Sequence, residues 1–294
     1  MCGRFVSARK RLELLEEFSI ERDRVADGPD PEPDPDYNVA PTRRVYAVME
    51  RRPRDQERDE EPERPRGGLP DARALASTER PRGGLPDARA LASTERSPAR
   101  ELRLVRWGLV PSWAKDASGG GRLINARAET IAVKPAFRRA FAKRRCILPA
   151  DGYYEWQTVS EQGKQRKQPY YIYRKDGGAL AFAGIYELWR DEALPADHEH
   201  AWLWTAAIIT TQATDDVGQI HDRMPMVITQ DHWADWLNPD NSEPGQLQAT
   251  MLPAMVGGLT SHPVSTAVNS VRNNGPELIA PLSADQERPP GELF

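Results

Sequence analysis

The stretches LAFAGIYELW (180–189) and WLWTAAIITT (202–211) decide the fold class of this 294-residue chain. Both are rich in aromatic, β-branched and small apolar residues, a composition typical of β-strands. The segment between them is polar and contains PADHEH (195–200), which is typical of a loop. The sequence therefore predicts two long strands joined by an exposed connection.

Shorter runs of the same kind recur along the chain and outnumber the helical patterns. The further expected strands are VYAVM (45–49), LRLVRWGLV (102–110), CIL (146–148), PYYIYR (169–174) and MVIT (226–229). The expected helices are one that begins after an N-cap at Ser7, KPAFRRAFAKRR (134–145) and DHWADWL (231–237). Strands predominate without regular alternation of strand and helix, so the predicted class is α+β.

Charge and cysteine content exclude several classes of protein. The formal net charge is −4 and the pI is about 5.9, so the chain lacks the global basic character of many nucleic-acid-binding proteins. The two cysteines, Cys2 and Cys146, do not form a disulfide framework and fit a reducing compartment. No apolar run is long enough to cross a bilayer, and charges from Arg4 to Arg11 exclude a signal peptide. The expectation is a cytoplasmic monomer without a membrane partner.

A duplicated segment interrupts the chain. RPRGGLPDARALASTE occupies residues 64–79 and recurs unchanged at 80–95, within a run rich in arginine, proline and acids from Glu50 to Arg100. Two copies without aromatic residues do not make a repeat architecture, which needs apolar faces to stack. The run 50–100 is predicted to be a disordered insertion, and contact of its arginines with nucleic acid is the alternative. Residues 1–49 and 101–294 would then form one discontinuous domain.

The segment 101–145 is basic although the whole chain is acidic. It contains eleven Lys and Arg residues and three acids, interleaved with Trp107, Trp113 and Phe137. Cations together with aromatic stacking platforms suit single-stranded nucleic acid. A solvated helix face is the alternative for residues 138–145.

The amino end, MCGRF (1–5), places one of the two cysteines directly after Met1. Cysteine is small enough for Met1 to be removed, and Cys2 would then carry a free α-amine beside its thiol. An inert, buried thiol is the alternative.

Three further segments place polar side chains within strand-like sequence. NARAE (125–129) puts Asn125 and Arg127 on one face of a strand, and ADGYYEW (150–156) puts Glu155 between two aromatic residues. Glu155 is either a buried acid–base group or an exposed residue of an edge strand. His221 in IHDRMP (220–225) precedes a strand-like segment. No metal site or cofactor is expected, because His198 and His200 lack further ligands nearby and no nucleotide or zinc motif occurs.

Eight motifs in a fixed order resemble the SRAP family of abasic-site processing proteins, also called SOS-response-associated peptidases. They are MCGRF (1–5), YNVAPT (37–42), RWGLVPSWAKD (106–116), NARAET (125–130), CILPADGYYEW (146–156), AGIYELW (183–189), IHDRMP (220–225) and HPVSTAVNSVRNNGPELI (262–279). The resemblance covers almost everything outside residues 50–100. It implies one domain with a β-rich, partly barrel-like core flanked by short helices, and nucleoid association in a bacterium. It also implies a covalent link between Cys2 and abasic sites in single-stranded DNA.

The resemblance implies a role for each matching residue. Cys2 forms the link, Asn125 holds the amino end and the sugar, Glu155 transfers protons, and His221 helps to open the sugar. The implied DNA contacts are made by the arginines Arg4 and Arg127, the aromatic Trp113 and the supporting hydroxyl Thr210.

Three other functions compete with covalent processing of abasic sites. A glutamine amidotransferase with an N-terminal cysteine also begins Met-Cys-Gly, but it needs an early Asn-Gly motif, and Asn274-Gly275 stands near the end. An autopeptidase that only removes Met1 is compatible with the family name. A noncatalytic binder of single strands explains the basic segment but not Cys2, Glu155 and His221 together.

Overall fold

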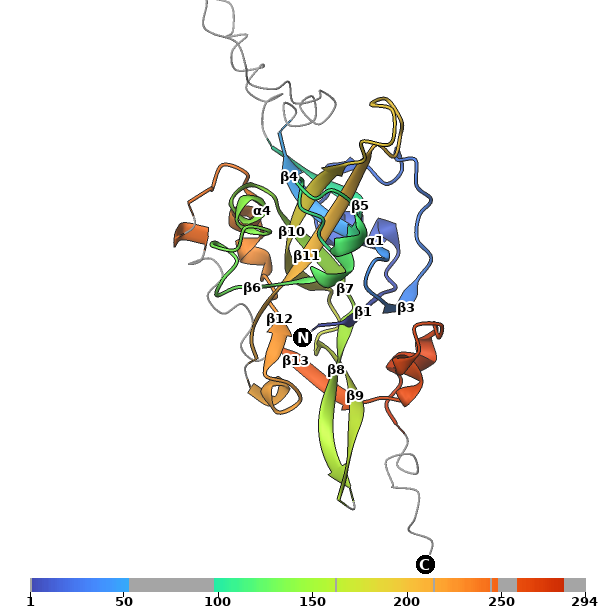
Figure 1. Ribbon diagram of the computed structural model, residues 1–294. Helices are drawn as coiled ribbons and strands as arrows, with labels where there is room; N and C mark the ends of the chain where they lie inside the picture. The colour runs from blue at the N-terminus through green and yellow to red at the C-terminus, as the bar shows by residue number, and fades with distance from the viewer. Residues whose placement is uncertain are drawn as a thin grey trace, which may run out of the picture.

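The computed structural model describes residues 2–52, 98–161, 163–213, 215–243, 245–247 and 258–282. Two β-sheets dominate these residues, and short helices lie around them (Figure 1). The larger sheet forms the upper body in this view, and the smaller sheet extends below it as a long hairpin. The α+β class expected from the sequence is confirmed.

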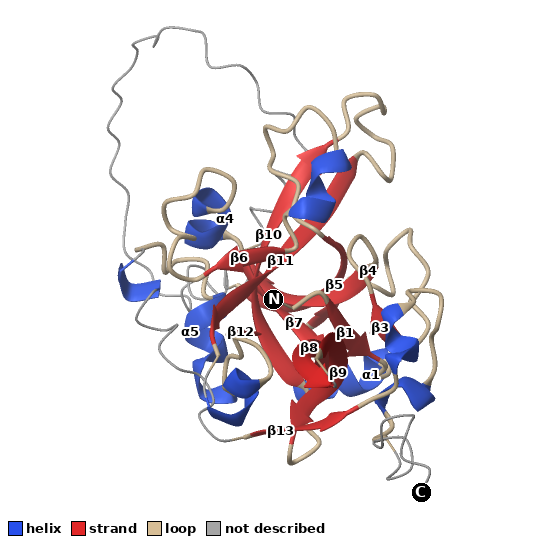
Figure 2. Cartoon of the chain, turned by 60° about the horizontal axis from the view of Figure 1, so that its bottom comes forward, coloured by secondary structure: helices blue, strands red, loops and turns tan. Residues whose placement is uncertain are grey.

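Five strands of the larger sheet close into a barrel. In order around the barrel they are β11 (Trp202–Gln212), β10 (Leu180–Arg190), β7 (Arg145–Ala150), β4 (Arg44–Arg51) and β5 (Ala99–Trp107). The ring closes where β5 pairs in parallel with β11, with Trp107 opposite Ala206. Closure removes the exposed edges that an open sheet would present, and Figure 2 shows this ring of strands.

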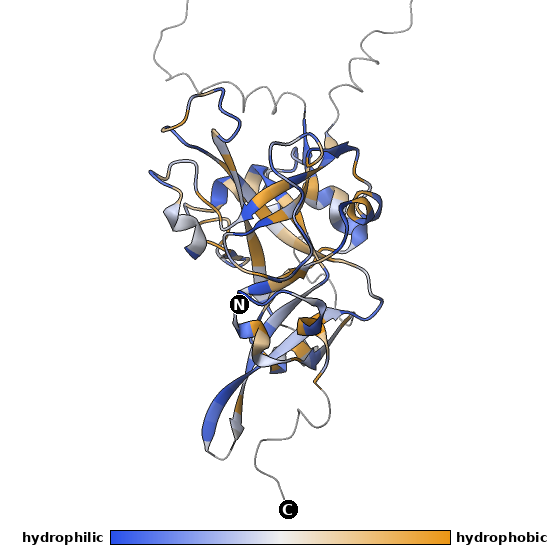
Figure 3. Cartoon of the chain, turned by 90° about the vertical axis from the view of Figure 1, so that its right-hand side faces the viewer, coloured by the Kyte–Doolittle hydropathy of each residue, from blue (hydrophilic) through white to orange (hydrophobic). Residues whose placement is uncertain are grey.

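The smaller sheet carries the amino end of the chain. Its strands, in order, are β13 (Leu259–Pro263), β9 (Lys164–Arg174), β8 (Gly152–Glu161), β1 (Arg4–Ser7) and β3 (Asp36–Val39). β8 and β9 form the long hairpin, whose far part is hydrophilic (Figure 3). Short strands and helices complete the described chain. They are α1 (Arg11–Glu17), β2 (Arg22–Asp23), η1 (Ser118–Arg122), β6 (Asn125–Arg127), α4 (Arg138–Lys143), η2 (Asp215–Gln219), β12 (Arg223–Pro225), η3 (Gln230–His232), α5 (Trp233–Leu237), η4 (Thr266–Asn269) and η5 (Pro276–Ile279).

β10 shows why a continuous apolar run becomes a strand here. Successive side chains of a strand point to opposite faces, and both faces of β10 are covered. Ala181, Ala183 and Ile185 pack in one apolar cluster, whereas Phe182 and Tyr186 pack in another. The run 180–189 therefore needs no polar face.

The smaller sheet meets the barrel through aromatic rings. The Phe5 ring from β1 packs edge-on against Trp107 of β5, with centroids 5.0 Å apart, and against Phe182 of β10 at 6.0 Å. The Tyr153 ring from β8 contacts Phe182 in the same way at 6.0 Å. These contacts hold the amino end of the chain against the barrel.

A buried arginine joins two helices to the start of β7. Arg145 is 3 % exposed, and its guanidinium donates hydrogen bonds to the backbone carbonyls of Phe141, Ala142, Trp236 and Asn238. Burial lowers the pKa of Arg145 to about 10. The cation is thus held by carbonyl dipoles near the carboxyl ends of α4 and α5, where a positive charge is favourable.

Replacing this arginine should destabilise the fold. Arg145→Met leaves four buried or partly buried carbonyls without these donors, so we expect the free energy of unfolding to fall by about 2–4 kcal/mol. Chemical denaturation measures the loss. Arg139→Met, on the exposed surface of α4, is the matched control and should change stability by less than about 0.5 kcal/mol. Equal stability of the two variants would contradict a stabilising role for the hydrogen bonds of Arg145.

Several local expectations were wrong. MVIT (226–229) forms only an isolated bridge at Val227, because the strand there, β12, ends at Pro225. Ser7 is the last residue of β1 rather than an N-cap, and Lys10 precedes α1 without a side-chain cap. The helix expected over 134–145 is limited to Arg138–Lys143.

The ends of the predicted insertion belong to the barrel. Glu50 pairs with Arg100 and Arg51 with Ala99, so β4 and β5 extend into the run 50–100 at both ends. The duplicated segments at 64–95 lie outside the described residues. The division into a discontinuous domain and an insertion stays a prediction.

Candidate active site around Cys2

Cys2 is fully buried where the smaller sheet meets the barrel. Its exposed fraction is 0 %, and it packs in the same apolar cluster as Phe5, Trp107 and Tyr153. The Sγ atom lies 3.8 Å from the Arg4 carbonyl oxygen. Burial, and after it the negative charge of Glu155, raises the pKa of the thiol. The thiol is therefore protonated at neutral pH and needs a base to become a nucleophile.

Asn125 fixes the backbone of Cys2. It begins β6, which pairs in parallel with β11 so that Asn125 lies opposite Ile208. Its Nδ2 donates a hydrogen bond of 2.7 Å to the Cys2 carbonyl oxygen. Its Oδ1 is buried without a hydrogen-bond partner in the part of the chain that the structure describes. An acceptor of this kind beside the amino end suits an amine or a sugar hydroxyl.

Glu155 is a buried residue of β8 rather than an exposed one. It is 2 % exposed, and the register of β1 against β8 places Phe5 opposite Tyr153, two residues before Glu155. Tyr153 and Glu155 share one face of the strand because side chains alternate. The charge of Glu155 acts on the Cys2 thiol. The exposed position on an edge strand, one of the two expectations for this glutamate, is wrong, because β8 lies between β9 and β1. Its acid–base role stays a prediction.

His221 lies in the turn before β12 and faces partly to solvent, with a side chain 30 % exposed. Its Nδ1 accepts a hydrogen bond of 2.9 Å from the Arg223 backbone N–H. A neutral ring whose Nδ1 accepts carries its proton on Nε2. Nδ1 also lies 2.8 Å from Asp222 Oδ1, which becomes a partner when the ring is protonated. The neighbouring Ile220 and Met224 pack in the Cys2 cluster.

Arg223, two residues after His221, is a structural residue of this site that was not predicted from the sequence. Its guanidinium forms two hydrogen bonds with the Glu129 carboxylate, at 2.6 and 3.0 Å, and one of 2.6 Å with the Thr210 carbonyl. It thereby ties β12 to β11 and to the loop after β6. The available signal was an arginine in IHDRMP, two residues after the candidate histidine.

Two of the expected DNA contacts, Arg127 and Thr210, lie beside Arg223 and differ in exposure. Arg127 is exposed and pairs with Thr210 across β6 and β11. Thr210 is 0 % exposed, and its Oγ1 accepts a hydrogen bond of 3.4 Å from Arg223. The hydroxyl of Thr210 therefore supports neighbouring protein groups, whereas Arg127 is open to a ligand.

Arg4 points away from the apolar cluster that contains Cys2. It lies opposite Tyr154 in the pairing of β1 with β8. Because side chains alternate along a strand, Arg4 and the next residue, Phe5, point to opposite faces of the sheet. Its Nη1 donates to Asn38 Oδ1 at 2.9 Å and to the Val268 carbonyl at 3.1 Å. Burial lowers the pKa of Arg4, and the charge of Asp36 opposes this. The structure thus uses Arg4 to attach the carboxyl-terminal segment, and its binding of phosphate stays a prediction.

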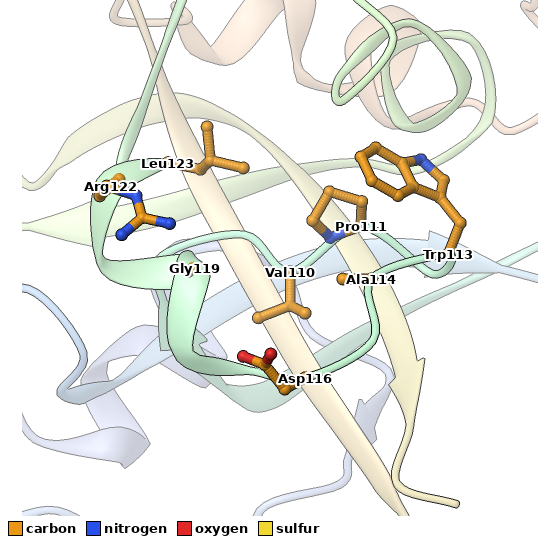
Figure 4. Close-up of a pocket in the computed structure, with 9 residues that line it drawn as sticks. Val110, Pro111, Trp113, Ala114, Asp116, Gly119, Arg122 and Leu123 are labelled. Atoms are coloured by element: carbon orange, nitrogen blue, oxygen red, sulfur yellow. The ribbon is translucent and has the colours of Figure 1, made fainter.

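Trp113 stands at the rim of an apolar pocket of about 290 Å³ (Figure 4). Its side chain is 69 % exposed, and Asp116 and Arg122 provide charged groups at the pocket. Gly108, with φ of 130°, allows the loop to turn, and a Cβ there would lie 2.7 Å from the Gly120 carbonyl oxygen. Leu123, which also lines the pocket, is two residues from Asn125.

The described residues contain no group of three or more His, Cys, Asp and Glu side chains that could hold a metal ion. Within the same residues, no helix has the length and apolar character needed to span a bilayer.

A closed barrel with a second sheet packed against it, and with a buried cysteine beside a glutamate and an asparagine, defines an α+β protein with a cysteine-centred site. The chain belongs to the SOS response associated peptidase (SRAP) family, whose model matches residues 1–271. The resemblance noted from the motifs is confirmed.

Relatives and solved structures agree with this assignment. The chain is 34 % identical over 279 residues to the abasic site processing protein YoaM of Bacillus subtilis, covering 95 % of this chain and 97 % of YoaM. It is 35 % identical over 206 residues to the mouse abasic site processing protein HMCES, covering 60 % of this chain and 56 % of HMCES. A crystal structure of a Bacteroides thetaiotaomicron protein has the same fold, with a TM-score of 0.67 at 23 % identity over 96 % of this chain and 100 % of that one.

Proposed function

We propose that this protein processes abasic sites in single-stranded DNA by a covalent link to Cys2, after Met1 has been removed. The observation that carries the proposal is the position of Cys2, which is buried with its carbonyl held by Asn125 and with the charge of Glu155 acting on its thiol. The names of the relatives, abasic site processing proteins, supply the substrate class.

The chemistry follows from two nucleophiles on one residue. An abasic deoxyribose opens to an aldehyde at C1′, and the α-amine, with a pKa near 7.7–8.0, is neutral far more often than a lysine amine at pH 7. The amine adds to the aldehyde, and loss of water leaves a protonated imine. The Cys2 sulfur then bonds to C1′. The product is a thiazolidine, a five-membered ring of N, Cα, Cβ, S and C1′.

Glu155 and His221 have separate tasks in this scheme. Glu155 takes a proton from the ammonium form of the Cys2 α-amine, gives it to the departing hydroxyl, and then accepts the proton of the thiol, which passes to solvent as the carboxylate is restored. His221 assists the closed sugar in opening when its ring is protonated, because Nε2 can then give a proton to the ring oxygen. Both assignments use general acid–base transfer by positioned side chains.

The basic segment supports DNA as the partner, but the structure reduces its number of available cations. Arg145 is buried, Arg103 pairs with Glu101 at 2.8 Å, and Arg144 pairs with Glu187 at 2.7 Å. The exposed members are Lys115, Arg122, Arg127, Lys134, Arg138, Arg139 and Lys143. These remain to bind phosphates.

The amidotransferase alternative receives no support from its required motif. Asn274 Oδ1 accepts from the Tyr37 N–H at 2.7 Å, and its Nδ2 donates to the Pro35 carbonyl at 3.1 Å. The residue thus attaches the carboxyl-terminal segment to the chain around β3. Both polar atoms of its side chain are hydrogen-bonded to backbone groups, so the side chain does not serve as an oxyanion donor.

The decisive test incubates the protein lacking Met1 with a single-stranded oligonucleotide that contains one abasic site. Intact mass under denaturing conditions should show one species equal to protein plus DNA minus one water. A matched oligonucleotide without the abasic site should give none. A protein that removes its own Met1 but gives no DNA-linked species in this test would instead favour an autopeptidase.

Binding that precedes the link should depend steeply on salt. Each phosphate neutralised on a single strand contributes a slope of about −0.7 to the plot of log K against log salt. Arg127→Gln should therefore make the slope shallower by about 0.7, measured by fluorescence anisotropy. Lys175→Gln, an exposed cation outside the basic segment, is the control. A slope near zero for the unaltered protein would exclude the electrostatic model.

A further inference from the structure

The hydroxyl of Tyr153 is a buried polar group that the proposed chemistry has not used. The residue is 0 % exposed, and its oxygen has no hydrogen-bond partner among the residues that the structure describes. Buried polar side-chain atoms in native proteins are hydrogen-bonded in the large majority of cases. An unpartnered phenol in an apolar cluster therefore indicates a partner that forms during function.

Tyr153 shares its apolar cluster and its strand face with reacting groups. Tyr153 packs in the cluster that contains Cys2 and lies on the same face of β8 as Glu155. Its ring is oriented by the edge-on contact with Phe182. Burial, and after it the charges of Cys2 and Glu155, raises the pKa of the phenol. The group is therefore a protonated donor at neutral pH.

The neighbouring tyrosine shows what a satisfied phenol looks like in this strand. Tyr154 points to the opposite face of the sheet, and its hydroxyl donates a hydrogen bond of 2.8 Å to the Tyr37 carbonyl. Its role is structural. The two adjacent residues thus have the same chemistry and different surroundings.

We propose that Tyr153 is a catalytic residue for ring closure, whose hydroxyl donates a hydrogen bond to the Cys2 sulfur as the sulfur attacks C1′. The inference rests on the proposed function. In this step the S–H proton passes to the Glu155 carboxylate, the S–C1′ bond forms, and the π electrons of the protonated C=N bond return to nitrogen. Negative charge develops on sulfur before the new bond is complete, and a donor already in place stabilises it without reorganisation.

The test separates imine formation from ring closure. Tyr153→Phe removes only the hydroxyl, so the imine trapped by borohydride should form at the rate of the unaltered protein. Formation of the heat-stable link should slow by about 10- to 100-fold, the effect of losing a hydrogen bond to a charged atom. The midpoint of thermal unfolding should stay the same or rise, because an unsatisfied buried group has been removed.

Tyr154→Phe is the matched control. It loses the hydrogen bond to Tyr37, so its unfolding midpoint should fall by about 2–4 °C, while both rates with the abasic oligonucleotide stay unchanged. Ring closure at an unaltered rate in Tyr153→Phe would overturn the inference and leave the proposed function standing. If the unaltered protein forms neither imine nor link, the proposed function itself fails.

Discussion

Cys2→Ala is expected to abolish the heat-stable link to an abasic oligonucleotide. Alanine keeps the α-amine, so the imine can still form and be trapped by borohydride. It has no thiol, so the five-membered ring cannot close. Cys2→Ser should likewise give the imine without the stable ring. Time courses on denaturing gels, with and without borohydride, distinguish the two products.

The other cysteine provides the control for this result. Cys146 is also fully buried and also unpaired, and burial raises the pKa of its thiol as it does for Cys2. It lies within β7, so it has no free amine beside its thiol. Cys146→Ala should link to DNA at the rate of the unaltered protein. A link of ordinary stability in Cys2→Ala would exclude the proposed mechanism.

Glu155→Gln should have the second largest effect, because it slows both formation and release of the link. Ring closure and ring opening pass through the same transition states, so the group that transfers protons in one direction must do so in the other. A true general acid–base contributes about 10²–10⁴-fold. We expect both rates to fall by comparable factors in this range, measured by link formation and by release of a preformed link to a competing strand.

His221→Ala should behave differently, because its task ends when the sugar has opened. Formation should slow mainly at low pH, and release should change less. Time courses of link formation and release between pH 5 and 8 compare His221→Ala with Glu155→Gln.

Glu187→Gln is the matched control for Glu155→Gln, because Glu187 is also a buried glutamate, 4 % exposed and bonded to Arg144. If Glu155→Gln releases the link at the unaltered rate, proton transfer during ring opening must be assigned to His221 instead.

The strands were predictable where composition alone identifies them. The runs 180–189 and 202–211 lie within β10 and β11, and 45–49 lies within β4. MVIT (226–229) has the same composition but pairs only at Val227. Strand formation there depends on a free edge, and β10 already occupies this edge of β11 from Ile208 back to Trp202, beyond the part that pairs with β12. Such competition between distant segments is not visible in a local pattern.

Burial decided the roles that the motifs left open. Alternation places Arg4 and Phe5 on opposite faces of a strand, but it does not say which face meets the barrel. The structure turns Phe5 towards Trp107 and Arg4 towards Asn38. In the same way, Thr210 is enclosed while Arg127 opposite it is open.

The sequence by itself determined the α+β class, the family, and the chemical groups at Cys2, Asn125, Glu155 and His221, because composition and ordered motifs are local properties of the chain. Only the tertiary structure decided that Asn125 holds the Cys2 carbonyl, that Glu155 is buried with its charge acting on the thiol, and that the hydroxyl of Tyr153 is enclosed with them. These relations arise from closure of the barrel and from the register of β1 on β8. Both depend on pairing between segments far apart in the chain, which no local pattern contains.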